Sequence, residues 1–196
     1  MLRHLPNLIC LARIVLVVPV VQALDGGRYE LALLLFGVAA VSDGLDGFLA
    51  KRFNWTSKLG RFLDPLADKL LLVAVFITAS WSSLVPWWLA AVAIARDLVI
   101  GFGALIFRVW FGPLDGRPTL VSKVNTGLQI ACLLAAMLHA AEGWFPAELV
   151  AALAVAAFVT TLLSGVDYTG AFVRRAWVIT GRGRSPLPGG GGAGNG

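Results

Sequence analysis

The chain has 196 residues, of which 58% are hydrophobic and only 14% are charged, and its formal net charge is +5. Because soluble domains carry about a quarter charged residues, this composition excludes an ordinary soluble globular protein and indicates an integral membrane protein. Cys10 and Cys132 both lie inside apolar segments, so no disulfide framework is expected. No nucleic-acid partner is expected either.

Six apolar segments follow one another along the chain and predict an all-α protein with six transmembrane helices. Each segment is long enough to cross roughly 30 Å of hydrocarbon at about 1.5 Å per residue. Residues 1–180 would form a single transmembrane domain, and the Gly-rich residues 181–196 a disordered tail. The predicted helices cover residues 5–24, 29–50, 59–81, 85–109, 122–141 and 146–172.

Most lysines and arginines lie at alternate ends of the six segments, which places these ends on one side of the membrane. An excess of lysine and arginine indicates the cytoplasmic side. The connections on the other side carry acidic or neutral residues, such as Asp25, Ser82 and Glu142. Both termini and the polar ends of the helices should therefore be cytoplasmic, in a multi-pass protein of the inner (plasma) membrane. The basic residues are Arg3, then Lys51, Arg52, Lys58 and Arg61, then Arg108, Arg117 and Lys123, and finally Arg174, Arg175, Arg182 and Arg184.

Four aspartates in the second and third segments are the most informative residues. Asp43 and Asp46 are three residues apart, and Asp64 and Asp68 are four apart, so each pair shares one face of its helix. A short basic turn joins the two segments, which would direct all four carboxylates into one small volume. Acids are costly in a membrane protein unless they have a functional role.

Four carboxylates in one volume must be protonated or neutralised by a cation, because like charges disfavour ionisation. A hard divalent ion such as Mg²⁺ fits this cluster, since it prefers oxygen ligands. The absence of histidine and cysteine from the cluster argues against zinc. Gly47 and Gly60 would allow a close approach of backbones or of a bulky ligand.

The stretch from Asp43 to Asp68 resembles the signature of the CDP-alcohol phosphatidyltransferases, Asp-x2-Asp-Gly-x2-Ala-Arg-x8-Gly-x3-Asp-x3-Asp. Every fixed position is met except one, where Lys51 replaces the usual arginine. The resemblance extends to the six-helix plan and to the opening from Pro6 to Pro19. It implies transfer of the phosphatidyl group of a CDP-linked lipid to an alcohol, with release of CMP, directly and without a covalent intermediate.

The resemblance also implies roles for individual residues. Asp43, Asp46 and Asp64 would bind Mg²⁺ or Mn²⁺, and Asp68 would bind metal and act as general base on the attacking hydroxyl. Lysine is a point charge without the planar fork of arginine, so Lys51 would contact the phosphates differently. The pocket for the cytidine and diphosphate of CDP-diacylglycerol would be formed by Gly44, Gly47, Ala50, Lys51 and Gly60.

The acceptor would be bound by Arg96, Lys123 and Asn125. The segment from Pro118 to Thr126 resembles the cardiolipin synthase branch of the family, whose acceptor is phosphatidylglycerol. The phosphatidylglycerophosphate synthase branch has a second lysine where this chain has Asn125, which suits the more highly charged glycerol 3-phosphate. Phosphatidylglycerol is therefore the expected acceptor, and glycerol 3-phosphate is the alternative.

A transporter or cation channel is the rival class, because acids also line ion paths through membranes. Transporters place such residues near the midplane and often contain repeated halves, whereas this chain has one copy of the Asp-x2-Asp-Gly pattern. The family resemblance further implies a homodimer in contact with membrane lipids.

Overall fold

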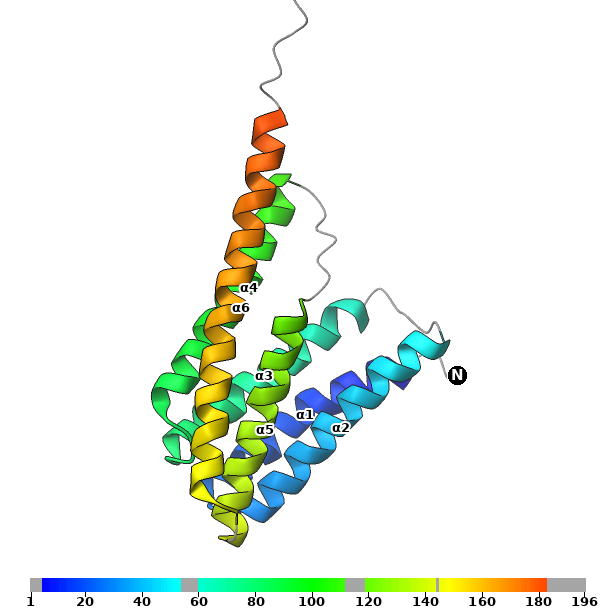
Figure 1. Cartoon of the computed structure of the whole chain (residues 1–196). Coiled ribbons are helices and arrows are strands. Elements are labelled where there is room, and N and C mark those ends of the chain that lie inside the picture. Colours follow the sequence, from blue (N-terminus) through cyan, green and yellow to red (C-terminus); the bar gives the residue numbers. More distant parts are fainter. Residues whose placement is uncertain (1–4, 54–59, 112–118, 144, 183–196) are drawn as a thin grey trace, which may run out of the picture.

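A computed structural model describes residues 5–53, 60–111, 119–143 and 145–182, and all regular structure within these ranges is helical (Figure 1). The all-α plan of six helices is thereby confirmed over the described ranges. The helices are α1 (Leu5–Asp25), α2 (Tyr29–Phe53), α3 (Gly60–Trp81), α4 (Trp87–Phe111), α5 (Leu120–Glu142) and α6 (Ala147–Arg182).

Most helix boundaries lie within two residues of the predicted positions, and the ends of α2 and α6 differ by more. Helix α2 continues to Phe53, so Lys51 and Arg52 belong to the helix and not to the turn that follows it. Helix α6 continues from the expected end at residue 172 to Arg182, because residues 173–180 contain no glycine or proline that would stop it. The expected tail begins inside this helix, and residues 183–196 lie outside the described part of the chain.

Glycines in the left-handed backbone region mark two of the tight turns. Gly27 has a φ of 67° between α1 and α2, and Gly143 has a φ of 71° at the end of α5. The Gly143 amide donates to the His139 carbonyl at 3.0 Å and closes the last turn of α5. At the other end of α5, the Thr119 side chain accepts a hydrogen bond from the Ser122 amide at 3.2 Å.

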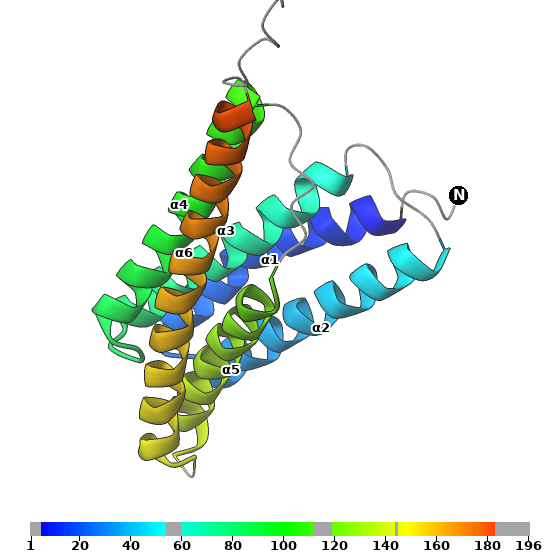
Figure 2. The ribbon, with the colours of Figure 1, turned by 45° about the horizontal axis from the view of Figure 1, so that its top comes forward.

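Successive helices run in opposite directions, so the start of α1, the end of α2 and the starts of α3 and α5 lie away from the three short turns (Figures 1 and 2). Helix α1 packs against both α2 and α3. Helix α5 packs against α2 and α6, and α4 packs against α3 and α6. Helix α1 therefore packs against both helices that carry the aspartates.

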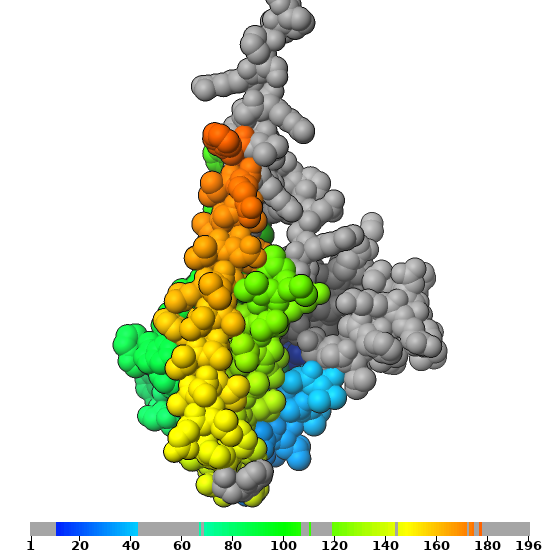
Figure 3. All heavy atoms as spheres, in the orientation of Figure 1, coloured from blue at the N-terminus to red at the C-terminus, as the bar shows by residue number. Residues whose placement is uncertain are grey.

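The interior consists of aliphatic and phenylalanine side chains, and the outer faces are also rich in apolar residues. Phe36, Phe76 and Leu133 are at most 2% exposed, and each such side chain contributes up to about 3 kcal/mol by burial. Figure 3 shows α5 and α6 side by side on one outer face. The exposed apolar side chains of α6 include Leu149, Val155, Val159, Leu162, Leu163 and Val166, a pattern that suits contact with lipid.

Three helices of the described residues are long and apolar enough to cross a membrane. These spans are Trp87–Ile106, Leu120–Glu142 and Ala147–Ala171. Shorter apolar stretches occur in the other half of the molecule at Tyr29–Ser42 and Lys69–Trp81. The predicted membrane character is thus carried most clearly by α4, α5 and α6.

Candidate active site

The four aspartates lie on two unbroken helices. Asp43 and Asp46 belong to the second half of α2, and Asp64 and Asp68 belong to the first turns of α3. Helical backbone at both places keeps each pair on one helix face, as the spacing predicted. Their side chains lie outside the described part of the structure, so their contacts remain a prediction.

The residues expected at the CDP-linked lipid lie on the same two helices. Gly44, Gly47, Ala50 and Lys51 follow one another along α2, and Gly60 is the first residue of α3. Their side-chain surroundings also lie outside the described part.

A divalent ion fits this donor set by its chemistry. Each helix offers two carboxylates at a spacing that brings both to one face, and carboxylate oxygens are the ligands that Mg²⁺ and Mn²⁺ prefer. Among the side chains that the structure does describe, no three His, Cys, Asp or Glu residues come close enough to hold a metal.

Arg96 lies at the meeting point of α4, α5 and α6 and is only 7% exposed. Its Nη2 donates to the Ser122 hydroxyl of α5 at 2.7 Å and to the Ser164 hydroxyl of α6. Its Nη1 donates to Asp97 Oδ1 at 2.7 Å. Its Cζ lies 5.7 Å from the ring centre of Tyr168, within the range of a cation–π contact. Arg96 thus joins three helices through charge-assisted hydrogen bonds.

Asp97 connects this group to α3. Its second oxygen, Oδ2, lies 2.5 Å from Lys69 Nζ, and the side chain is 11% exposed. The Asp97 carboxylate therefore pairs with two cations, Lys69 of α3 and Arg96 of α4. Lys69 directly follows Asp68 in the sequence, so the ion pair reaches the helix turn that carries the predicted general base.

Asn125 lies one turn beyond Ser122 and is completely buried between α5 and α6. Its Oδ1 accepts hydrogen bonds from the hydroxyls of Thr160 at 3.0 Å and Thr161 at 2.8 Å. Gln129 donates to Thr161 from the next turn of α5 at 3.2 Å. Asn125 Nδ2 has no hydrogen-bond partner among the described atoms. The result is a neutral polar seam along the interface of α5 and α6.

The three residues predicted to bind the acceptor do not share one surface. Arg96 is buried among three helices, Asn125 is buried in the seam, and Lys123 is exposed in the first turns of α5. Lys123 is therefore the member of this set whose charge is open to a ligand. Arg96 and Asn125 lie close by, and their hydrogen bonds hold the helix from which Lys123 projects.

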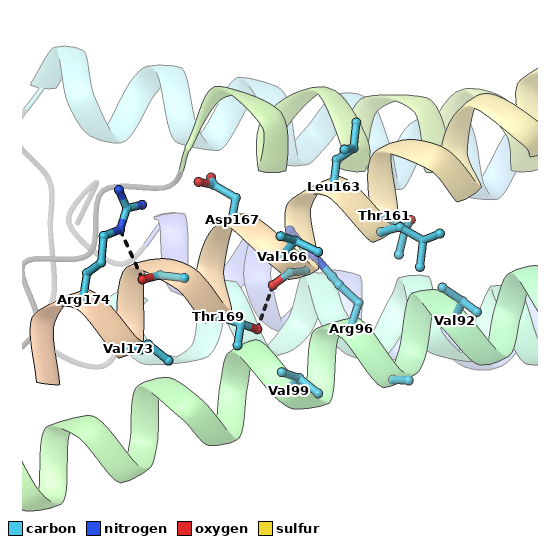
Figure 4. Close-up of a pocket in the computed structure, with 14 residues that line it drawn as sticks. Val92, Arg96, Val99, Thr161, Leu163, Val166, Asp167, Thr169, Val173 and Arg174 are labelled. Atoms are coloured by element: carbon cyan, nitrogen blue, oxygen red, sulfur yellow. Dashed lines mark hydrogen bonds between the residues drawn. The ribbon is translucent and has the colours of Figure 1, made fainter. Parts of the chain in front are cut away.

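A groove of about 1060 Å³ runs between α4 and α6 (Figure 4). The wall of the groove is largely apolar and includes Val92 and Val99 of α4 and Val166 and Val173 of α6. The side chain of Arg96 reaches into it from α4, and Arg174 lies toward one end (Figure 4). Its shape and apolar wall suit a hydrocarbon chain.

Residues 3–178 match the CDP-alcohol phosphatidyltransferase family. The chain belongs to this family. The members are transferases of phospholipid synthesis and are generally dependent on a divalent metal, which agrees with the donor set on α2 and α3. The match covers all six helices apart from the last residues of α6.

The curated relatives fall into two named groups. A probable cardiolipin synthase (CMP-forming) of Drosophila melanogaster is 34% identical over 66% of this chain, which spans only 45% of that protein's length. A CDP-diacylglycerol–glycerol-3-phosphate 3-phosphatidyltransferase of Bacillus subtilis is 33% identical over 84% of this chain and 93% of its own. Its counterpart in Escherichia coli K12 is 38% identical over 71% of this chain and 77% of its own.

Several functional candidates of this phosphatidyltransferase emerged only from the structure. The sequence did not single out Lys69, Ser164 or the pair Thr160 and Thr161. A signal for the last three was present, because hydroxyl side chains at helical spacing within an apolar segment often form contacts between membrane helices. Nothing in the sequence connects Lys69 with Asp97.

Proposed function

We propose that this phosphatidyltransferase acts on CDP-diacylglycerol and phosphatidylglycerol, forming cardiolipin and releasing CMP. Family membership supports the transfer chemistry and argues against the transporter alternative. The observation that carries the choice of acceptor is the position of Asn125. This neutral side chain is buried with its carbonyl oxygen bonded to two threonines, so Lys123 is left as the exposed cation at this part of α5, which suits a phosphodiester with a single charge.

The predicted roles of the aspartates complete the reaction. Asp43, Asp46 and Asp64 would hold Mg²⁺ or Mn²⁺, and Asp68 would hold metal and accept the proton of the attacking hydroxyl. When bound, the ion neutralises negative charge that develops on the diphosphate. The acceptor oxygen forms a bond to the phosphorus of the phosphatidyl group, the bond from that phosphorus to the oxygen of CMP breaks, and CMP leaves with the electron pair.

The pocket for CDP would be lined by Gly44, Gly47 and Gly60, with Ala50 beside them and Lys51 at the phosphates. The protein would cross the inner (plasma) membrane six times with both termini in the cytoplasm, and would work as a homodimer. These assignments rest on the charge pattern and on family resemblance.

The groove between α4 and α6 supports a lipid acceptor. Phosphatidylglycerol has acyl chains that need an apolar surface close to the reacting headgroup, whereas glycerol 3-phosphate has none. The groove passes Arg96, which is bonded to Ser122 directly before Lys123. An acyl chain in this groove would therefore place its headgroup near the start of α5.

Glycerol 3-phosphate is the second candidate acceptor. The Bacillus and Escherichia relatives are named for that reaction, and the Bacillus protein matches this chain over nearly its whole length. The finding that favours it is thus the extent of the match, in contrast to the partial match with the Drosophila protein.

The deciding experiment measures CMP release by purified protein in detergent with CDP-diacylglycerol, Mg²⁺ and one acceptor at a time. Release with phosphatidylglycerol and not with glycerol 3-phosphate is the expected result. Release with glycerol 3-phosphate alone would overturn the proposed acceptor and leave the transfer chemistry intact. Release with neither acceptor, from folded protein, would contradict the proposed function.

A groove variant tests the lipid site separately. Val99→Trp would fill part of the groove, and displacing about two methylene groups should raise the KM for phosphatidylglycerol about tenfold. Val159→Trp is the matched control, because Val159 is similarly exposed on α6 but does not line the groove. A rise in the KM for CDP-diacylglycerol alone would assign the groove to the donor lipid instead.

A further inference from the structure

A single carboxylate connects the two halves of the proposed active site. Asp97 accepts a hydrogen bond from Arg96 with one oxygen and pairs with Lys69 through the other. Lys69 belongs to α3, and Asp97 and Arg96 belong to α4. Because Asp97 is nearly buried and both of its oxygens are engaged, its position is fixed on two sides.

The connection continues from α4 into α5 and α6. Arg96 donates to Ser122 on α5 and to Ser164 on α6 through the same nitrogen. An arginine whose guanidinium group is bonded to a carboxylate and two hydroxyls has little freedom to move. The hydrogen-bonded chain therefore runs from Lys69 through Asp97 and Arg96 to Ser122 without interruption.

The two ends of this chain are neighbours of proposed reacting residues. Lys69 follows Asp68 on α3, and Ser122 precedes Lys123 on α5. A helix advances by about 100° per residue, so a fixed point at Lys69 restrains the rotation of α3 about its own axis. The same argument applies to α5 at Ser122. The network thus restrains the orientation of both helices relative to α4.

We propose that Asp97 is a positioning residue that sets the aspartate-bearing turn of α3 in register with the start of α5. This inference rests on the proposed function, in which α3 supplies metal ligands and the general base and α5 supplies the acceptor cation. Asp97 touches neither substrate nor metal in this role, and acts through Lys69 and Arg96. A misplacement of about 1 Å between reacting groups costs up to a hundredfold in rate.

The test compares Asp97→Asn, Asp97→Glu and Lys69→Met in the full-length protein. Asp97→Asn keeps the size of the side chain and removes the charge that holds Lys69. Its kcat should fall by about ten- to a hundredfold, while the KM for each substrate changes by less than about threefold. Lys69→Met should reproduce this loss, and because Lys69 is partly exposed, this variant removes less of the buried structure.

Two further results separate positioning from general loss of stability. The double variant Lys69→Met, Asp97→Asn should be no slower than the slower single variant, since residues that act through one contact are not additive. Asp97→Glu should recover part of the lost kcat. The control is Val75→Ala, which removes packing from a fully buried site elsewhere on α3 and should leave kcat unchanged in folded protein.

A readout that needs no turnover is the binding of Mn²⁺, followed by electron paramagnetic resonance. Asp97→Asn and Lys69→Met should weaken Mn²⁺ binding about tenfold, and Val75→Ala should not. Wild-type kcat and Mn²⁺ affinity in both network variants would overturn the proposal, as would additive losses in the double variant. If glycerol 3-phosphate is the true acceptor, the same comparison holds with that substrate. If neither acceptor releases CMP, the proposed function fails while Mn²⁺ binding still decides the role of Asp97.

Discussion

The two halves of the candidate active site differ in the partners of their charged side chains. Helices α2 and α3 carry four aspartates toward one end of the bundle, and under the proposed function a cation from outside the chain would neutralise them. At α4 the contacts are internal, because Lys69 and Arg96 both pair with the carboxylate of Asp97 and Arg96 also donates to two serine hydroxyls. The first half is suited to chemistry with a metal, and the second to holding helices in place.

The two halves should respond differently to substitution. Substitution of an aspartate in the first half is expected to lower the reaction rate strongly, because these residues are the proposed metal ligands and general base. The residues of the Arg96 half form contacts between several helices, so their substitution should also lower the free energy of unfolding. The four predictions that follow test this division, beginning with the largest expected effect.

Asp68→Asn should lower the rate of CMP release about a thousandfold, because the amide cannot accept the proton of the attacking hydroxyl. The measurement is the initial rate with CDP-diacylglycerol, Mg²⁺ and the active acceptor. Asp25→Asn is the control, since Asp25 is exposed at the opposite side of the bundle. A folded Asp68→Asn protein that keeps the wild-type rate would show that the proton is accepted elsewhere.

Arg96→Gln should reduce the free energy of unfolding by about 3 kcal/mol, because it removes one partner of a buried ion pair and the bonds to both serines. Thermal unfolding in detergent measures this loss. Ser164→Ala provides the comparison and should cost about 1 kcal/mol, since the Arg96 guanidinium keeps Asp97 and Ser122. Equal stability of the Arg96→Gln and wild-type proteins would contradict the structural role of the Arg96 group.

Lys123→Gln should raise the KM for the acceptor about tenfold and leave the KM for CDP-diacylglycerol unchanged. The reason is the loss of one charge-assisted hydrogen bond to the acceptor phosphate, worth about 1.5 kcal/mol. Steady-state kinetics with each substrate varied in turn would measure both constants. Arg28→Gln, an exposed cation on the other side of the bundle, should change neither constant, and an equal effect of both substitutions would indicate general attraction to anionic lipid.

Asn125→Ala should reduce the free energy of unfolding by only about 1 kcal/mol. Thr160 and Thr161 keep hydrogen bonds to backbone carbonyls of their own helix, so neither hydroxyl is left without a partner. Thermal unfolding beside the Arg96→Gln variant would compare the neutral seam with the charged group directly. A loss as large as that of Arg96→Gln would show that the seam is as important as the ion pairs.

The sequence determined the class of fold, the helical plan and the family. Apolar segments and local spacing are sufficient for this, because helix formation and the i, i+3 and i, i+4 positions of Asp43, Asp46, Asp64 and Asp68 depend on neighbours along the chain. The largest errors in the predicted helix ends are at α2 and α6, which both continue beyond the predicted residue.

The tertiary structure decided how residues distant in the sequence meet. Arg96 is 26 residues from Ser122 and 68 from Ser164, and Lys69 meets Asp97 only because α3 packs against α4. No local pattern encodes such contacts, since they depend on the relative rotation of whole helices. For the same reason, Asn125 could be recognised from the sequence as a polar residue near the acceptor, whereas its burial between α5 and α6 required the packing of the complete bundle.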